Sequence, residues 1–235
     1  MSKPLIIVDG MKGGVGKSNT NKMLIDYLVR TAAKVIVVDT DTGAADIAKA
    51  FTPGGQIVDV LTISLDHADG WLDLAAVCEE NPDVTIIVNQ GARSHEGMKK
   101  FWCELEPSLR HTERPLTLVF VMAPMEESAL ALQSLLKILP VTRVVIAKSV
   151  KDGVTDFTDY YEGTVLKDEV EKRGGCDFVI PVYYSKLRAL LDGPFGENLD
   201  RRANLGDAAN ANDRAIRISV RNLRAAIDKA LQGVL

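Results

Sequence analysis

The sequence has few cysteines, no excess of positive charge and no long apolar run, and each shortage excludes a class of protein. Cys78, Cys103 and Cys176 are odd in number and widely spaced, so they fit neither a disulfide framework nor a metal-site pattern. We expect reduced, mostly buried thiols in a cytoplasmic protein. The net charge of −4 argues against wholesale coating of nucleic acid but leaves room for a local basic patch. The apolar runs are far too short to span a membrane, and the first predicted strand begins too early to leave room for a signal peptide.

The sequence also lacks internal repeats, low-complexity tracts and linkers. Its 235 residues suit one large α/β domain better than two, and an apolar fraction of 46% is enough for a full core. Strand-like apolar runs alternate with helical segments. This alternation is typical of an α/β fold with a doubly wound, mostly parallel sheet and helices on both faces.

The predicted elements follow from this alternation of apolar runs and helical segments. Strands are predicted at 4–8, 35–38, 84–88, 116–122, 141–147 and 176–180. Helices are predicted at 19–31, 44–51, 70–80, 94–109, 128–139, 156–173, 185–191 and 213–231. Residues 56–65 are expected to form a short strand pair or an irregular excursion, and residues 194–211 a polar loop.

The most informative stretch joins the first strand to the first helix. Residues 10–18 are G-M-K-G-G-V-G-K-S. A glycine-rich turn between a strand and a helix is the context of a phosphate-binding loop, because its backbone N–H groups turn toward phosphate oxygens. We expect Lys17 to reach the β- and γ-phosphates and the Ser18 hydroxyl to ligate Mg²⁺. The predicted nucleotide-binding residues are Gly13, Gly14, Val15, Gly16, Lys17, Ser18 and Asn19.

The usual pattern G-x-x-x-x-G-K-[ST] fails, because its first glycine falls on Met11. The stretch from Lys12 to Ser18 instead resembles the deviant Walker A loop of the ParA/MinD family of ATPases, which has a second lysine. The resemblance implies a SIMIBI-like P-loop NTPase fold, ATP and Mg²⁺ as ligands, and a homodimer in which Lys12 touches the nucleotide of the other subunit. Residues 38–41 and 46–50 look most like the StbB/TraL-type branch, which is tied to plasmid stability or conjugation.

A second loop follows the second predicted strand, and ligands of open α/β sheets lie beyond such strand ends. Its residues Asp39-Thr40-Asp41 resemble the D-x-D segment of the same family. By that resemblance Asp41 orients the attacking water and Asp39 supports Mg²⁺ through water. The chemistry agrees, since hydrolysis needs an acceptor near the nucleophile and carboxylates near the metal. The alternative is that both carboxylates are solvated or cap the next helix.

A third loop departs from the family pattern. A Walker B carboxylate is expected after the strand at 84–88, and the residue there is Asn89. An amide brings no negative charge, which weakens Mg²⁺ affinity and puts fast hydrolysis in doubt. Gln90 and Arg93 are candidate water-positioning or γ-phosphate-sensing groups. Alternatively, they belong to a surface loop that turns at Gly91.

The base-recognition position is also unusual. Many relatives place an asparagine after the strand that here ends near Ala147, and Lys148 follows in this chain. Its side chain is expected either to lie along the base or to face solvent.

The closing helix carries a row of arginines beside its apolar face. At 100° per residue the four fall within about 80° of arc. They are Arg214, Arg217, Arg221 and Arg224. In ParA-like proteins basic residues near the C-terminus bind DNA non-specifically once ATP has built the dimer, so the resemblance implies DNA binding here and a plasmid-encoded adaptor as a further partner. The alternative is a solvated face paired with acids such as Asp213 and Asp228.

We therefore expect a dimerising switch ATPase of plasmid partition, stability or conjugation, with ATP held between two subunits and slow hydrolysis. Two alternatives stay open. A metabolic P-loop enzyme, similar to dethiobiotin synthetase, would need a substrate pocket and would not need Lys12. A nucleotide-binding module with little hydrolysis is permitted by Asn89. An electron carrier like the nitrogenase iron protein is disfavoured, because no cysteine lies in a glycine-rich loop at the strand ends expected to face the dimer, and Cys103 lies in a predicted helix.

Overall fold

The structure is a computed structural model, in which a parallel sheet of seven strands is the central element. It describes residues 2–11, 14–31, 34–41, 46–51, 58–91, 94–141, 143–150, 156–181, 183, 185–195 and 198–232. The strand order is β3-β2-β4-β1-β5-β6-β7, and every pairing is parallel. The strands are β1 (Leu5–Asp9), β2 (Val35–Asp39), β3 (Val58–Thr62), β4 (Thr85–Asn89), β5 (Leu116–Met122), β6 (Arg143–Lys148) and β7 (Cys176–Val179). The predicted parallel α/β architecture is therefore confirmed.

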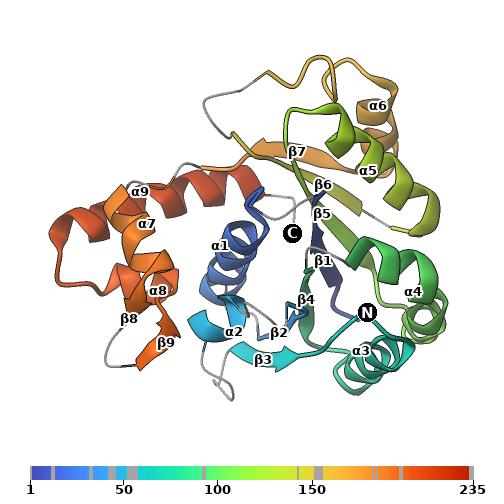
Figure 1. Ribbon diagram of the computed structural model, residues 1–235, viewed down its shortest axis with the longest axis horizontal. Coiled ribbons are helices and arrows are strands. Elements are labelled where there is room, and N and C mark those ends of the chain that lie inside the picture. Colours follow the sequence, from blue (N-terminus) through green and yellow to red (C-terminus); the bar gives the residue numbers. More distant parts are fainter. Residues whose placement is uncertain are drawn as a thin grey trace.

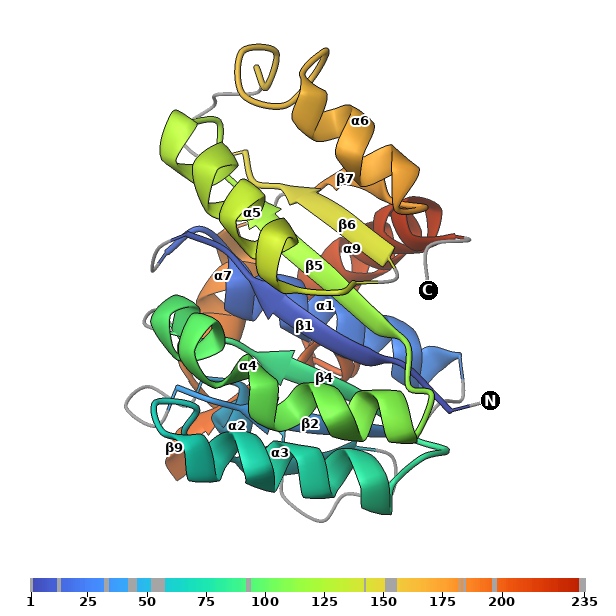
Figure 2. The ribbon, with the colours of Figure 1, turned by 90° about the vertical axis from the view of Figure 1, so that its right-hand side faces the viewer.

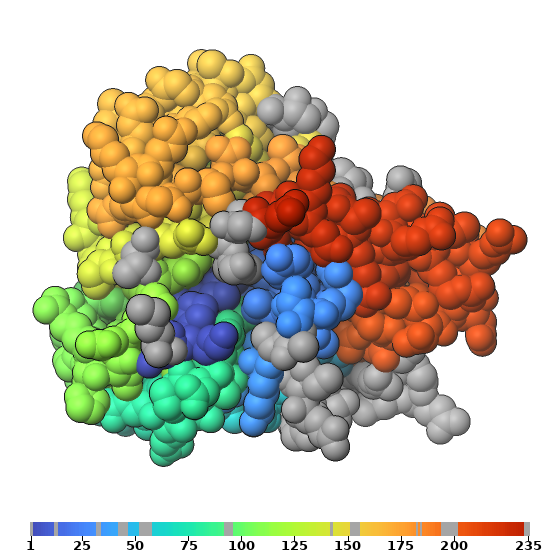
Figure 3. Space-filling model, turned by 180° about the vertical axis from the view of Figure 1, so that it is seen from behind, coloured from blue at the N-terminus to red at the C-terminus, as the bar shows by residue number. Residues whose placement is uncertain are grey.

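Helices cover both faces of this sheet (Figures 1 and 2). One face carries α3 (Ala68–Glu80), α4 (Ser94–His111), α5 (Glu126–Ile138) and α6 (Val165–Lys172). The other carries α1 (Lys17–Arg30), α2 (Asp46–Ala50), α7 (Ser185–Asp192), α8 (Leu205–Ala209) and α9 (Arg214–Leu231). Figure 3 shows the C-terminal segments, in orange and red, gathered beside α1; we call α7 to α9 with their connections the C-terminal lobe. Within the described residues, no helix is both long and apolar enough to cross a membrane.

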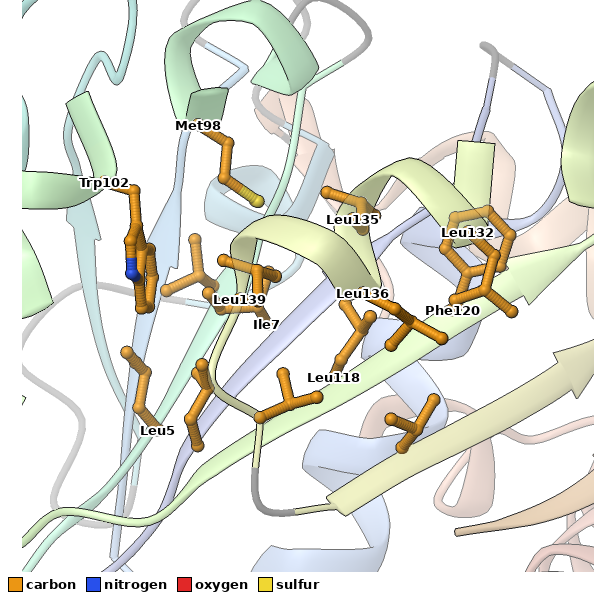
Figure 4. Packing of buried hydrophobic residues seen from close by; sticks show 14 of the residues in the cluster. Leu5, Ile7, Met98, Trp102, Leu118, Phe120, Leu132, Leu135, Leu136 and Leu139 are labelled. Atoms are coloured by element: carbon orange, nitrogen blue, oxygen red, sulfur yellow. The ribbon is translucent and has the colours of Figure 1, made fainter. Parts of the chain in front are cut away.

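The five inner strands β2, β4, β1, β5 and β6 are buried on both faces, because successive side chains enter two separate cores, whereas the edge strands β3 and β7 are only partly buried. In β1, Leu5 and Ile7 pack toward α3 to α6, whereas Ile6 and Val8 pack toward α1 and the C-terminal lobe. Figure 4 shows Trp102 of α4 and the leucines of α5 over β1 and β5. Strands buried in this way have nearly continuous apolar sequences, which is why the sequence predicted all but one strand of this sheet.

The strand that the sequence did not predict, β3, lies at one edge of the sheet. The described part of the predicted segment 56–65, residues 58–65, contains this one strand, which pairs in parallel with β2. Residues 52–57 lie outside the described part of the chain. The expected polar loop at 194–211 was also wrong, since it contains an antiparallel pair, β8 (Pro194–Phe195) and β9 (Asn198–Arg202), and then α8. This segment is ordered by contacts with α2, to which Asn204 Nδ2 donates at the Ala50 carbonyl (3.0 Å).

The helix predicted at 156–173 is shorter than expected and begins at Val165. The preceding residues form turns, because Phe157 and Tyr161 are drawn into the core and Gly163 adopts a left-handed φ of 70°. The cysteine prediction also needs a correction. Cys78 is buried and Cys176 partly so, but Cys103 lies on the outer face of α4 and is exposed.

Arg114, which precedes β5, ties three elements together at the end of the sheet where the strands begin. Its Nη1 donates to the carbonyls of Lys3 (2.8 Å) and Val84 (3.0 Å). Its Nη2 donates to those of Cys78 (2.9 Å) and Asn81 (2.5 Å), at the C-terminal end of α3, where the helix dipole favours a cation. Burial lowers the pKa of this guanidinium from its usual range. The hydrogen bonds to four carbonyls therefore compensate a charge that is largely removed from water.

We expect Arg114→Met to lower the free energy of unfolding by about 3 kcal/mol, because it leaves buried carbonyls without donors. Urea denaturation measures the change. Arg110→Met is the matched control: its side chain is 77% exposed and pairs with Glu106, so its cost should stay below about 1 kcal/mol. Equal costs for the two variants would contradict the role given to Arg114.

Candidate functional site

The glycine-rich loop begins where β1 ends and leads directly into α1. Gly14 and Gly16 have φ values of 79° and 108°, a left-handed conformation that favours glycine, and Gly16 is the N-cap of α1. The first turn of α1 therefore presents N–H groups at the end of β1 without a side chain in front of them. Lys12 and Gly13 lie outside the described residues.

Lys17 is the first residue of α1, and its side chain is buried against the loop. Its Nζ donates to the Gly10 carbonyl at 3.5 Å. Burial lowers the pKa of this ammonium, and the nearby charges of Asp9 and Asp41 act in the opposite direction. A partly desolvated ammonium at a helix N-terminus is suited to binding a polyanion, because the opposite charge would stabilise the protonated form that burial disfavours. Ser18 follows in the same turn and is half-buried.

Asp39 lies at the end of β2 with no exposed surface, and both of its oxygens accept hydrogen bonds. Oδ2 accepts from the N–H groups of Ile47 and Ala48 (both 3.1 Å) in α2. Oδ1 accepts from the Asn89 side chain (2.9 Å) and from the Asp41 N–H (3.4 Å). The carboxylate therefore caps the next helix, which was the alternative to a metal-supporting role.

Asn21, which was not predicted from the sequence, completes this chain of buried polar groups. It lies one turn after Lys17 in α1, and its Nδ2 donates to the Lys17 carbonyl (3.2 Å) and to Asn89 Oδ1 (2.6 Å). Its own Oδ1 is buried and has no hydrogen-bond partner in the described part of the chain. The only signal was its position four residues after Lys17, which puts both side chains on one helix face.

The loops after β2 and β4 are joined to each other through Thr40. Its hydroxyl donates to the Asn89 carbonyl (3.0 Å) and accepts from the Gly91 N–H (2.8 Å). Gln90, between them, is only 1% exposed, so it is not a surface residue. Neither of its side-chain polar atoms has a hydrogen-bond partner among the residues described. Arg93 lies outside the described residues.

A pocket of about 320 Å³ opens beside the glycine-rich loop, beyond the ends of β6 and β7. One wall is formed by Gly14, Gly16 and Asn19, and the other by the segments after those two strands. Tyr183 on that second wall donates to the Asn19 carbonyl at 3.4 Å. The volume falls within the range of small-ligand pockets, and a crevice at the strand ends is where an α/β sheet binds them. Tyr183 was not predicted from the sequence as a site residue.

Lys148 takes neither of the two predicted positions, because it is buried among partners of its own chain. Its Nζ pairs with Asp177 (2.7 Å) and with Glu162. It also lies 5.4 Å from the ring centroid of Tyr161 and 5.9 Å from that of Phe157. These contacts hold the C-terminal end of β6 against β7. The segments that follow these two strands form the second wall of the pocket.

The four arginines of α9 have different surroundings. Arg224 is not part of a free row, since it forms an ion pair with Asp26 of α1 (2.5 Å). Arg217 is exposed but donates to the carbonyls of Ala211 and Asn212, before α9 (2.6 and 2.9 Å). Arg214 and Arg221 are exposed and, within the described residues, have no ion-pair partner.

Asp213 and Asp228 do not neutralise this face. Asp213 is the N-cap of α9, where its Oδ1 accepts from the Ala215 N–H (2.7 Å). Asp228 pairs with Arg30 of α1 (2.6 Å). Among the described residues, Arg214 and Arg221 therefore form the solvated face of the alternative, but the expected pairing with Asp213 or Asp228 is not found.

Comparison with known proteins agrees with the architecture. No protein-family model matches the chain. Protein MobD from Acidithiobacillus ferrooxidans is 29% identical over 181 residues, which are 77% of this chain and 78% of MobD. Chloroplast FtsY from Physcomitrella patens has a TM-score of 0.50 and 15% identity over 97% of this chain and 66% of its own. The MinD cell division protein of Aquifex aeolicus has a TM-score of 0.49 and 14% identity over 94% of this chain and 97% of its own.

At these identities the structural likeness concerns the fold alone. This chain spans just under two thirds of the length of the chloroplast FtsY. Together with the strand order, the likeness to chloroplast FtsY confirms the predicted fold, a doubly wound parallel sheet with helices on both faces.

The free energy of unfolding is expected to depend on pH through the ion pairs of Lys148, Glu162, Lys167 and Asp177, which we call the Lys148 cluster. Lys148 and Lys167 hydrogen-bond Glu162 and lower its pKa from the usual 4.5. Because the folded-state pKa is the lower one, the stabilisation is present above about pH 4.5 and is lost as the pH falls through the folded-state pKa. We expect Glu162→Gln to lower the free energy of unfolding by about 1 kcal/mol at pH 7 and by less at pH 3, as measured by urea denaturation.

The control for this measurement is Glu169→Gln on α6. Glu169 has one ion pair, with Arg173 in the next turn, and is 42% exposed. A loss at Glu162 that matched this control, or that did not shrink in acid, would contradict the cluster's role.

Proposed function

We propose that the protein is a nucleotide-switched ATPase that dimerises around ATP, binds DNA non-specifically and acts in plasmid partition, plasmid stability or conjugative DNA transfer. The buried ammonium of Lys17, at the glycine turn that opens α1, is the observation that carries this proposal. The neighbouring pocket offers room for a nucleoside. The plasmid role is supported by the resemblance at residues 38–41 and 46–50.

The residues around Lys17 would each contact a different part of a bound nucleoside triphosphate and its Mg²⁺. N–H groups of residues 13–19 would contact phosphate oxygens, and Lys17 would pair with the β- and γ-phosphates. Ser18 and Asp39 would hold Mg²⁺, which neutralises charge on the transferred phosphate when bound. These residues fit a magnesium that comes with nucleotide, because Mg²⁺ takes one or two protein oxygens plus phosphates and water. The described residues contain no group of three acidic, histidine or cysteine ligands for an independent metal.

Hydrolysis would depend on a group that orients water near the γ-phosphate. Asp41 is the first candidate, since its charge acts on Lys17. Gln90 is the second, because its buried amide lacks a hydrogen-bond partner in the described structure. Asn89 is engaged with Asn21 and Asp39 instead. The amide at this position favours slow turnover, and a binding module without hydrolysis is the second candidate function.

We expect ATP and a non-hydrolysable analogue, but not ADP, to convert the protein to a dimer, as measured by light scattering. Lys17→Ala should abolish ATP binding. Lys12→Ala should retain ATP binding by the monomer but lose the dimer, because this lysine is proposed to reach the partner's nucleotide.

Lys34→Ala is the control for both lysine variants. Lys34 is exposed at the start of β2, the end of the sheet away from the loop, so dimerisation should be unchanged. Dimerisation that persisted in Lys12→Ala would contradict the shared-nucleotide arrangement. ATP binding that persisted in Lys17→Ala would contradict the nucleotide site itself.

The DNA-binding part of the proposal rests on Arg214 and Arg221. Reversing both to Glu should abolish ATP-dependent retention of DNA at low salt, because exposed arginines bind phosphates by releasing counterions. In single variants, the slope of log affinity against log salt should fall by about 0.9 for each DNA phosphate that the variant no longer neutralises. Filter binding at several salt concentrations measures both effects.

The matched control reverses Lys100 and Arg110 of α4, on the other face of the sheet, and so changes the net charge equally. Loss of DNA retention in both double variants would indicate an effect of net charge alone. Absence of DNA binding by the wild-type protein with ATP at low salt would rule out this part of the proposal.

A further inference from the structure

We propose that Asn89 is a positioning residue, which holds the carboxylate of Asp39 toward the nucleotide site, and that it is not a weakened metal ligand. The inference rests on the proposed function, because it concerns the same nucleotide site. It assigns the negative charge of that site to Asp39.

The position of Asn89 in the sheet brings it against both neighbours. In the parallel register it lies beside Asp39 of β2 on one side and beside Val8 of β1 on the other. Its side chain points to the face that carries α1, as the contact with Asn21 shows. This is the place where a Walker B carboxylate is expected.

Both ends of the Asn89 amide are engaged, and each has a defined direction. Its Oδ1 accepts from Asn21 Nδ2 at 2.6 Å, and its Nδ2 donates to Asp39 Oδ1 at 2.9 Å. Because Asp39 is an acceptor only, the group facing it must be a donor. Asparagine is therefore the side chain of this size that accepts on one side and donates on the other.

An aspartate at position 89 would not reproduce this arrangement. It would still accept from Asn21, but it would place a carboxylate oxygen about 3 Å from Asp39 Oδ1, where two like charges repel strongly. Asp39 has no room to turn away, since its Oδ2 holds the first N–H groups of α2. The orientation of Asp39 thus explains why an amide stands where a carboxylate was expected.

Asn21 extends the arrangement to the phosphate-binding helix. It donates to the Lys17 carbonyl and to Asn89, so the first turn of α1, the end of β4, the end of β2 and the start of α2 are linked by consecutive hydrogen bonds. Supporting groups of this kind orient a metal ligand, and their loss typically costs 10–100-fold in metal affinity.

The test compares Asn89→Asp and Asp39→Asn with the double variant that carries both. We expect Asn89→Asp to weaken Mg²⁺-dependent ATP binding by at least about tenfold, measured as the ratio of ATP dissociation constants with EDTA and with Mg²⁺. It should also lower the melting temperature of the nucleotide-free protein. The double variant restores one carboxylate and one amide at this contact, so it should recover most of the melting temperature and part of the Mg²⁺ effect.

Thr85→Val is the control, since Thr85 is a buried polar residue at the other end of β4 and should leave the Mg²⁺ ratio unchanged. A folded Asn89→Asp that binds Mg·ATP as tightly as wild type, or more tightly, would overturn the proposal. So would melting temperatures of the two single variants that simply add in the double variant. The melting temperatures need no nucleotide, so they test the Asn89–Asp39 pair even if wild-type protein fails to bind ATP, which would instead refute the proposed function.

Discussion

Parallel pairing brings the C-terminal ends of all seven sheet strands to the same end of the sheet. The polar groups of the candidate site lie at that end. Asp9, Asp39 and Asn89 each end a strand, and the glycine turn starts from the strand between β4 and β5. The rest of each strand is apolar and buried in two cores, so these residues cannot shift along the sheet without exposing that core. The site therefore takes its geometry from the register of β1, β2 and β4.

The electrostatics of the site follow from this burial. Lys17 is held where water is scarce, and Asp39 is satisfied by N–H donors from the backbone and from Asn89. A buried carboxylate with several donors stays in one orientation, whereas an exposed one would sample many. Protein groups alone therefore fix the orientation of Asp39, which lowers the cost of ordering this side chain on binding.

The sequence predicted the parts of the molecule whose signal is local. The apolar run of β1, the glycines at positions 14 and 16 and the lysine that opens α1 lie within a short segment, and together they define both the element types and their junction. Edge strand β3 was missed because its side chains are only partly buried and its sequence has no continuous apolar run. The short strands β8 and β9 depend on the rest of the C-terminal lobe and carry no periodic signal of their own.

The environments of charged residues were predicted least well, since their partners are distant in the sequence. Helical spacing put Arg224 in one row with three other arginines, but its partner Asp26 is 198 positions away. Lys148 forms ion pairs with Asp177, which is 29 positions later in the sequence, and with Glu162, which lies in a turn that was predicted to be helical. The amide of Asn89 was interpreted as a missing charge because the orientation of Asp39 cannot be inferred from the sequence.

The packing of α9 has a practical consequence for dissecting the protein. Its buried side chains, from Val220 to Leu231, complete the core beneath α1. Arg224 of α9 also forms an ion pair with the buried carboxylate of Asp26 on α1. Deleting the C-terminal helix to obtain a core fragment would expose that apolar surface and leave Asp26 without one of its two cations. The proposed DNA binding and nucleotide binding are therefore best tested by changing surface side chains, because shortening the polypeptide would disturb the fold on which both proposals rest.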